Sequence, residues 1–534
     1  MRRVIVAAVA LFLGTADLVA QPLNESNAIH ALLVAGNLPQ GKALEFPLLR
    51  VFYEQRSFRP AWSGTPLALR EARQMMAALA RADEEGLDPR AYHAADISLQ
   101  ATHLAPVDAA QYDILLSDGA LRYARDLRIG RADLKMLDAD VDLPQQSFDV
   151  VSALNAALAN DSVGTFLADL PPPHPEYVRL EKALARYREI ALRGGWPTLP
   201  EPFPADPSAT ADVGLLRQRL AFEDVDAESA SLAEAIMRFQ ERHGLAADGS
   251  VGPQTLRALN VSATERAAQI AANMERWRWL PRNFETDHVT VNVPDQRLTI
   301  VGPNGPVLTS RVVVGKPASP TPLLRAVATS VTINPPWNVP DDIARREILP
   351  KLHANPDYLL SEHMILRDGP RGDPFGQHID WEFVPASKFH YHLQQQPGPK
   401  NALGTVKLEL PNRFDVYLHY TSAEAAFALD TRDLSHGCVR VEQILPLASY
   451  ALARDPSSAI ASLQAAIASG ETQHLSLNKP LPIYLLYWTA FVDADGSMEF
   501  RPDIYGRDAR LIAAQGAGVA GTRVSLTQAD CAPA

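Results

Sequence analysis

The stretch HVTVNVPDQRLTIV, residues 288–301, marks the point at which the chain changes from helical to strand-like patterning. Apolar and polar residues alternate along it, which is the period of a half-buried β-strand. SRVVVG (310–315) continues the pattern, and RFDVYLHY (413–420) and LPIYLLYWTAFV (481–492) resume it. The C-terminal half is therefore predicted to be mainly β, with a segment of helical and loop character inserted at 341–400.

The residues before this stretch have helical periodicity. Between 28 and 205 the chain is rich in alanine, and apolar residues recur three and four positions apart, for example from Leu115 to Leu127. That spacing places them on one face of an α-helix and predicts a helical domain. The helix expected at 177–192 ends at GGWP (194–197), because glycine and proline terminate helices.

A small three-helix unit is expected at 206–262. The proline-rich segment PTLPEPFPADP (197–207) precedes it and has the composition of a linker. Within the unit, DGSVGPQT (248–255) combines a pair of residues suited to a tight turn, Asp248 and Gly249, with a proline suited to the first turn of the next helix.

Two tryptophans, Trp277 and Trp279, lie on a further helix expected at 262–283. Residues two positions apart on a helix point in different directions. We therefore expect these two side chains to pack in a core at a domain junction, and not to form one surface for stacking on sugars.

The N-terminus is typical of a secretory signal. Arg2 and Arg3 precede an apolar stretch at 4–13, and small residues follow as far as Ala20. Such a segment directs export and is removed afterwards. We predict export through residues 1–20, with an uncleaved anchor as the alternative.

Composition narrows the classes of function. The 534 residues exceed what one core accommodates and suggest about three domains. The formal net charge is −12 and no run rich in lysine and arginine occurs, which argues against a nucleic-acid ligand, because neutralising phosphates requires a basic face. No apolar run reaches the ~18 residues of a membrane-spanning helix. The two cysteines, Cys438 and Cys531, could pair in an exported protein, but a bridge to the C-terminal tail would constrain little.

The segment YLHYTSAEAAFALDTRDLSHGCVR, residues 417–440, holds the candidate chemistry. His419 ends a strand-like run, fifteen residues separate it from Ser435, and Cys438 follows in the text SHGC. A thiol becomes a good nucleophile when a neighbouring imidazole takes its proton or stabilises the thiolate. His419 and His436 are both candidates for this base, and their spacing does not decide between them.

The residues beside the thiol suit acyl transfer. Gly437 permits a backbone conformation that can direct N–H groups into an oxyanion hole. Arg440 can hold a substrate carboxylate through two hydrogen bonds, or it can form a structural ion pair. A zinc site is not indicated, since zinc requires about four ligands with short Cys/His spacing. The alternative for Cys438 is a small buried apolar residue.

These residues resemble the catalytic motif of the L,D-transpeptidases, whose catalytic domain is of the YkuD type. That motif consists of a His, a spacer of similar length, Ser/Thr-His-Gly-Cys, a variable residue, and Asn or Arg. His419 and the segment 435–440 match every position. GPKNALGTVKLELPN (398–412) is similar to the strand–turn–strand before the catalytic His, and INPPWNVP (333–340) is similar to the start of the family's inserted lid.

Other segments resemble the large multidomain Gram-negative members of the family. LPIYLLYWTAFVDADG (481–496) is similar to the end of the catalytic domain, and the three-helix unit is similar to a peptidoglycan-binding module. YEQRSFRPAW (53–62) and EEGLDP (84–89) are similar to the scaffold domain. The resemblance and the patterning predict a multidomain α+β protein with these parts: a signal peptide at 1–20, a helical scaffold domain at 28–205, a peptidoglycan-binding-like three-helix module at 206–262, a mainly-β catalytic domain at 285–508 with a lid subdomain at 341–400, and a tail at 509–534.

The resemblance also implies a mechanism without cofactor or metal. Cys438 attacks the carbonyl of the L-centre residue of a tetrapeptide stem, D-alanine leaves, and an amine of a second stem resolves the thioester into a 3→3 cross-link. His419 acts as the base, and the main-chain carbonyl of Tyr420 orients its ring; many members have Asp at this last position. His436, Gly437 and Cys438 supply oxyanion contacts through their main chain.

Substrate contacts and partners follow from the same resemblance. Arg440, Ser435 and Tyr420 are expected at the substrate, and Trp337 with the lid is expected over the cleft, although simple packing is the stronger expectation for Trp337. The implied partners are peptidoglycan stem peptides and glycan, together with cell-wall synthesis proteins, and the implied inhibitors are carbapenems. The implied location is the periplasm.

Two other functions remain open at this stage. A cysteine carboxypeptidase or amidase would use the same thioester but let water resolve it, trimming stems or releasing proteins linked to peptidoglycan. A non-catalytic peptidoglycan-binding protein would keep the fold, but would be expected to have lost the Cys438 and His419 pair.

Overall fold

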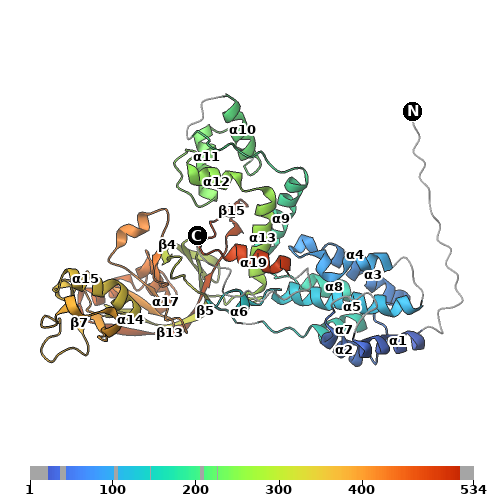
Figure 1. Ribbon diagram of the computed structural model, residues 1–534, viewed down its shortest axis with the longest axis horizontal. Helices are drawn as coiled ribbons and strands as arrows, with labels where there is room; N and C mark the ends of the chain where they lie inside the picture. Colours follow the sequence, from blue (N-terminus) through green and yellow to red (C-terminus); the bar gives the residue numbers. More distant parts are fainter. Residues whose placement is uncertain are drawn as a thin grey trace.

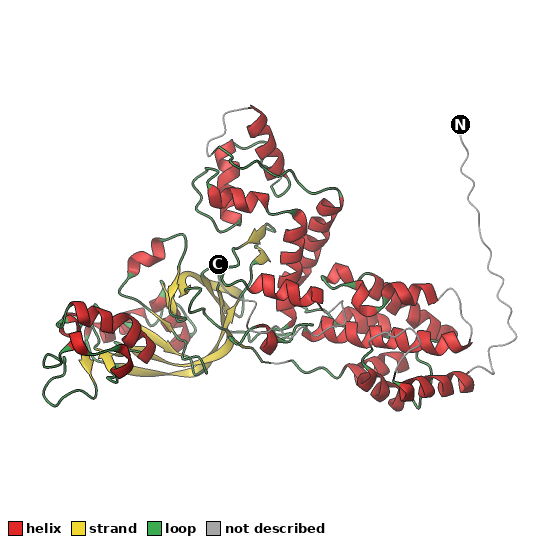
Figure 2. Cartoon of the chain, viewed as in Figure 1, coloured by secondary structure: helices red, strands yellow, loops and turns green. Residues whose placement is uncertain are grey.

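The computed structural model of the chain describes residues 22–36, 44–100, 106–144, 146–204, 210–224 and 226–517. The predicted signal segment and Cys531 lie outside these residues. Figure 1 shows three arms that meet around central helices: the N-terminal helices, a small helical unit, and a C-terminal part that holds most of the strands. The separation of helices from strands is plain in Figure 2 and confirms the predicted multidomain α+β class.

The N-terminal arm is helical and has its own core. Leu115, Leu116 and Leu127, on the periodic face identified in the sequence, are all buried. At the centre of this arm the buried Asp113 carboxylate accepts hydrogen bonds from the Tyr53 hydroxyl (2.6 Å) and from the main-chain N–H groups of residues 61 and 62. The helices are α1 (Pro22–Ala35), α2 (Phe46–Gln55), α3 (Pro66–Ala80), α4 (Ala94–Gln100), α5 (Pro106–Ile129), α7 (Val150–Ala159) and α8 (Val163–Asp169).

The small unit consists of α10 (Thr210–Ala221), α11 (Leu232–Arg242) and α12 (Pro253–Asn260), as predicted. Its turn is organised by Gln240, whose side-chain amide donates to Asp248 (2.8 Å) and accepts from the main-chain N–H of Gly249 (2.9 Å). Gly249 has a φ of +73°, a conformation that favours glycine. The segment DGSVGPQT therefore forms a turn that is held by the side chain of Gln240, from the preceding helix.

Two helices join the arms, α9 (Pro175–Leu192) and α13 (Ala263–Arg278), and they pack against each other. Trp277 stacks on Trp488 with ring centroids 4.7 Å apart. Trp277 and Trp279 are both buried, which confirms that they pack in a core at a junction.

His243, at the end of α11, stacks between a ring of the small unit and a ring of the C-terminal arm. Burial lowers the pKa of this histidine to about 3.

The C-terminal arm is built on a closed β-sheet. Its strand order starts with β1 (Val141–Asp142) and continues β5-β13-β2-β3-β4-β12-β10-β9, and β9 pairs again with β5. Helix α17 (Ile444–Ala453) packs its apolar face on this sheet and shares its core. The strands are β2 (His288–Asn292), β3 (Arg297–Gly302), β4 (Gly305–Gly315), β5 (Leu323–Ile333), β9 (Val406–Glu409), β10 (Leu418–His419), β12 (Val439–Val441) and β13 (Gln473–Leu486).

One short strand was not expected from the sequence. β1 (Val141–Asp142) lies within the region predicted to be helical, yet it pairs in parallel with the start of β5. A strand of two residues is too short to show an alternating pattern. The N-terminal region thus contributes an edge strand to the C-terminal sheet.

The insertion predicted at 341–400 folds as a small subdomain with its own core, and it starts a few residues earlier than predicted, with the strand at 337–338. Its sheet has the order β6-β8-β7, formed by β6 (Trp337–Asn338), β7 (Met364–Leu366) and β8 (Leu393–Gln395). Leu352, Leu359 and Trp381 are buried among its helices, which lie at the far end of the C-terminal arm in Figure 1. These helices are α14 (Asp341–Ile343), α15 (Leu349–Ala354) and α16 (Tyr358–Ser361), and a π-helical turn, Ala344–Ile348, joins the first two.

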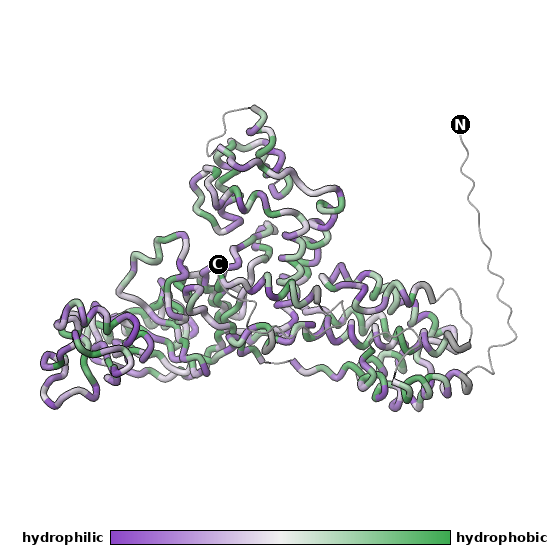
Figure 3. Tube along the Cα trace, viewed as in Figure 1, coloured by the Kyte–Doolittle hydropathy of each residue, from purple (hydrophilic) through white to green (hydrophobic). Residues whose placement is uncertain are grey.

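Hydrophobic and hydrophilic residues are interspersed along the helices (Figure 3). Within the described part of the chain, no helix combines the length and the apolar character needed to cross a membrane.

Candidate functional site

The structure places His419 and Cys438 on neighbouring strands. Cys438 lies between β11 (Asp433–Ser435) and β12, and β12 pairs in parallel with β10. Leu418 is opposite Val439 and His419 is opposite Arg440 in this pair. Eighteen residues separate His419 from Cys438 in sequence, yet His419 ends β10 and Cys438 immediately precedes β12, the strand that pairs with it.

The thiol of Cys438 is half-buried and contacts two groups of the loop before β10. Its Sγ lies 3.9 Å from the main-chain oxygen of Asp415, and the Tyr417 hydroxyl is within hydrogen-bonding reach of it. Burial raises the pKa of the Cys438 thiol, whereas contacts with Tyr417 and the positive charges of Lys407 and Arg440 act to lower it. Burial outweighs these contributions, so the resting thiol is protonated at neutral pH.

His419 is buried, with 4% of its surface exposed. Burial lowers its pKa to about 3, and the charges of Arg440 and Lys407 act in the same direction, while main-chain groups of Tyr420 and Leu403 oppose them. The ring is therefore neutral in the resting site and can accept a proton. Main-chain groups of Tyr420 and Leu403 lie within hydrogen-bonding reach of the ring, but none of the described residues forms a well-aligned hydrogen bond with its Nδ1. The Tyr417 ring packs edge-on against it, with centroids 5.6 Å apart.

The ring of His436 faces the lid. Its Nε2 lies 2.5 Å from a carboxylate oxygen of Glu347, in the turn Ala344–Ile348, and 3.0 Å from Nζ of Lys316. Desolvation acts to raise the pKa of Glu347, but hydrogen bonding and charge interactions with His436 and Lys316 together outweigh it, and the pKa lies below its usual value. This carboxylate is therefore ionised and accepts a hydrogen bond from the His436 ring. Of the two histidines considered as the base, His436 is thus engaged with the lid, whereas His419 lies on the strand that pairs with β12.

The turn that carries Cys438 is held by Ser435 and Gly437. The Ser435 hydroxyl donates to the carbonyl oxygen of Cys438 (2.5 Å) and accepts from the N–H of Gly437 (3.1 Å). Gly437 has a φ of +110°, which an L side chain rarely adopts. The structure gives Ser435 a role in shaping the turn, and it shows that the N–H of Gly437 is already used within the turn.

Arg440 lies beside the thiol without a counter-ion. Its pKa is lowered by burial, and its Nε is buried without a hydrogen-bond partner. No carboxylate among the described residues forms an ion pair with it, whereas nearby Lys407 pairs with Glu409 at 2.8 Å. Of the two roles considered for Arg440, the structural ion pair is thus absent from the described part of the chain, and the guanidinium is available to a bound carboxylate.

The contacts of Tyr420 and Trp337 are with Glu424 and with the lid. Burial, with a hydrogen bond to Glu424, raises the pKa of Tyr420 to about 12. Trp337 is half-buried in β6, opposite Gln395, and packs against the lid core. Its contacts are those of a packing residue, the stronger of the two expectations for this side chain.

Sequence reasoning missed Tyr417 and Lys407. Lys407 Nζ lies 4.0 Å from the centroid of the Tyr417 ring, and the tyrosine hydroxyl reaches Cys438. Tyr417 is two residues before His419, and alternate residues of a strand share a face. That spacing was the available signal for Tyr417, but Lys407 comes from another strand and could not be assigned in this way.

Comparison with known proteins agrees with this arrangement. Residues 286–458 match the family described as "L,D-transpeptidase catalytic domain". Residues 211–259 match "Putative peptidoglycan binding domain", and residues 47–184 match "Scaffold domain".

A relative from Haemophilus influenzae carries the name "Putative L,D-transpeptidase". It is 32% identical over 243 residues, which are 46% of this chain and 48% of the relative. The chain thus aligns with about half the length of this relative. In sequence order, the chain carries a scaffold domain, a peptidoglycan-binding-type domain and, as its mainly-β part, an L,D-transpeptidase catalytic domain.

Proposed function

We propose that the protein is an exported L,D-transpeptidase that forms 3→3 cross-links in peptidoglycan through a thioester on Cys438. The observation that carries the proposal is the pairing of β10 with β12, which sets a neutral, buried imidazole beside the strand that begins after the thiol. A neutral base next to a protonated nucleophile is the resting state that general-base activation requires.

In the first half of the reaction, the sulfur of Cys438 attacks the carbonyl carbon of the L-centre residue while the thiol proton moves to His419. The oxyanion is held by the main-chain N–H groups of His436 and Cys438, because Gly437 uses its own N–H within the turn. The bond to D-alanine then breaks, and His419 returns the proton to the leaving amine. A thioester remains on Cys438.

In the second half, the amine nitrogen of another stem attacks the thioester carbonyl while His419 takes a proton from it. The carbon–sulfur bond then breaks, and the proton passes to the departing sulfur, which restores the Cys438 thiol. Peptidoglycan stems carry carboxylates, and Arg440 offers an uncompensated guanidinium beside the thiol to bind one of them. Stem peptides and glycan are thus the proposed partners, together with cell-wall synthesis proteins, and the proposed location is the periplasm.

The proposal is tested by the products. The full chain without residues 1–20 is incubated with tetrapeptide-containing peptidoglycan, with Cys438→Ala alongside, and muropeptides are analysed by mass spectrometry. We expect dimers linked 3→3 in the wild-type reaction alone. Trimmed stems or released proteins without dimers would replace the proposal by a hydrolase on the same thioester, and products that do not depend on Cys438 would refute it.

The lid supplies a second expectation, on the fate of the thioester. Glu347 ties the lid to the turn of Cys438 through His436 and Lys316, which lies 3.6 Å from the carboxylate. Such partly exposed ion pairs contribute about 0–1 kcal/mol each, so Glu347→Gln should open the lid and raise the ratio of hydrolysed stems to cross-links up to about fivefold.

The same product analysis measures this ratio. Asp341→Asn is the matched control, because Asp341 pairs at 3.6 Å with Arg345 within the lid. A lid with no part in excluding water would give the wild-type ratio for Glu347→Gln, and equal shifts in both variants would show that the contact with His436 is not the cause.

A further inference from the structure

A short segment of the N-terminal region, residues 138–142, crosses to the C-terminal sheet; we name it the strap. It follows α6 (Leu134–Leu137) and contains β1, in which Val141 is opposite Leu323 of β5. The main-chain N–H of Leu323 also donates to the carbonyl of Asp140 (2.9 Å). The strap is therefore bonded to the catalytic domain through its backbone, although it lies far from that domain in sequence.

A series of side-chain contacts runs from Asp138, at the start of the strap, to the turn that carries Cys438. Asp138 accepts a hydrogen bond from Nε of Arg507 at 2.6 Å, and the guanidinium of Arg507 also donates to the carbonyl of Thr321 at 3.3 Å. The Thr321 hydroxyl in turn donates to the carbonyl of Gly437 at 2.9 Å. Asp138, Arg507 and Thr321 are thus linked to the residue that immediately precedes Cys438.

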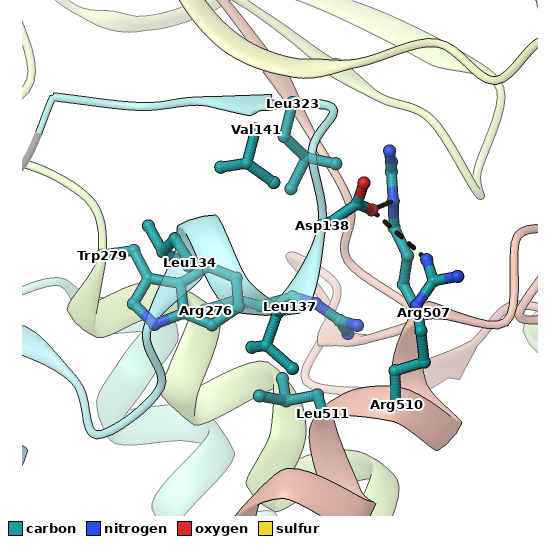
Figure 4. A pocket seen from close by; sticks show the side chains of 10 residues that line it. All are labelled: Leu134, Leu137, Asp138, Val141, Arg276, Trp279, Leu323, Arg507, Arg510 and Leu511. Atoms are coloured by element: carbon teal, nitrogen blue, oxygen red, sulfur yellow. Dashed lines mark hydrogen bonds and ion pairs between the residues drawn. The ribbon is translucent and has the colours of Figure 1, made fainter. Parts of the chain in front are cut away.

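The middle of this connection is well enclosed. Arg507, which begins α19 (Arg507–Ala517), and Thr321 are both buried. Tyr505 fixes the same loop, because its hydroxyl accepts from the N–H of Thr321 (3.2 Å) and donates to the carbonyl of Gly315 (2.5 Å). Figure 4 shows Asp138 pointing at Arg507 and Arg510 beside a small cavity that the strap helps to line. The contact therefore lies in a packed interface and is not an exposed ion pair.

The strap also contacts the loop before β10. The guanidinium of Arg413 donates to the carbonyls of Ala139 (3.0 Å) and Val141 (3.1 Å). Arg413 belongs to the loop before β10, in which the side chain of Asn412 bonds to the main chain at both ends. This loop contains Asp415, whose carbonyl contacts the sulfur of Cys438.

We propose that the strap is a positioning element of the active site. Asp138 acts through Arg507 and Thr321 on the turn of Cys438. Arg413 connects the strap to the loop before β10. The inference rests on the proposed function for its kinetic readout. Neither Asp138 nor Arg413 touches substrate in this scheme. They hold the turn that carries the thiol and the loop that contacts its sulfur, and a displacement of these segments by about 1 Å is enough to slow acyl transfer severely.

The variant that tests the proposal is Asp138→Asn in the full chain, which keeps the shape of the side chain and removes its charge. We expect the limiting rate of Cys438 acylation by a carbapenem to fall about tenfold with the half-saturating concentration unchanged. Asp138→Glu should recover part of the rate. Hydrogen exchange of peptides covering 411–416 and 435–440 should become faster in Asp138→Asn.

Arg510→Gln is the matched control. Arg510 also pairs with Asp138, at 3.3 Å, but it is more exposed than Arg507 and makes no contact with Thr321 in the described chain. Its acylation rate and its exchange should stay within about twofold of wild type. If Asp138→Asn does not fold, Arg413→Gln, on the surface, carries the same test for the other loop.

Equal losses in Asp138→Asn and Arg510→Gln, or wild-type rates and exchange in Asp138→Asn and Arg413→Gln, would overturn the proposal. If the wild-type chain is not acylated at all, the proposed function fails instead. Hydrogen exchange then still decides whether the strap orders the two loops.

Discussion

Incubation of the full chain with a carbapenem is expected to give a single covalent adduct on Cys438 and none in Cys438→Ala. The β-lactam carbonyl is an acyl donor of the kind that the proposed thioester chemistry accepts. Cys438 is the described cysteine, and the strand that follows it pairs with the strand of the neutral His419. Without the sulfur no thioester can form, and substrate turnover by such a site falls by about 10⁴-fold or more. Intact-mass spectrometry over time, followed by peptide mapping, measures the adduct and locates it.

Cys531→Ser is the control for this experiment, because Cys531 is the other thiol of the chain. It should be acylated at the wild-type rate. Acylation of Cys438→Ala to the wild-type extent would remove Cys438 from the role of nucleophile and with it the proposed function.

Replacement of His419 by alanine is expected to lower the rate of Cys438 acylation by about 10²–10⁴-fold, the usual contribution of a general base. The resting thiol is protonated because burial raises its pKa, so its proton must move during attack. The His436→Ala variant loses a contact with the lid that is worth about 0–1 kcal/mol and should slow acylation by less than about fivefold. Stopped-flow or mass-spectrometric acylation rates distinguish the two, and the reverse order would show that the roles are exchanged.

The pH dependence gives a separate test of His419. A free histidine has a pKa of about 6.5, but burial lowers that of His419 to about 3. The ring is therefore already unprotonated at pH 5, and the acylation rate should show no inflection near 6.5. An inflection there that disappears in His419→Ala would mean that the ring is protonated at neutral pH in the resting site.

The same lowered pKa links folding to pH. Because the unfolded chain binds a proton on His419 more readily than the folded chain, this residue favours folding fully above about pH 6.5 and progressively less as the pH falls toward 3. His243, with a pKa also lowered to about 3, acts in the same direction.

Local patterns in the sequence determined much of this protein. Alternation from 288 onward predicted strands that the structure places in a closed sheet, and three-and-four spacing from Leu115 to Leu127 predicted the buried face of α5. The spacing between His419 and Cys438 predicted the strand pair of the site. Such features can be predicted from the sequence because local backbone geometry imposes their period or spacing.

Tertiary structure alone decided which groups meet across long separations. The ring of His436 binds Glu347 of the lid, and Arg440 lacks a counter-ion among the described residues; neither fact follows from the motif that contains them. The strap could not be predicted from the sequence either. β1 is too short to show a period, and Asp138 accepts its hydrogen bond from Arg507, 369 positions away. Side-chain direction and long-range partners depend on how the chain packs in three dimensions, and spacing along the sequence does not contain that information.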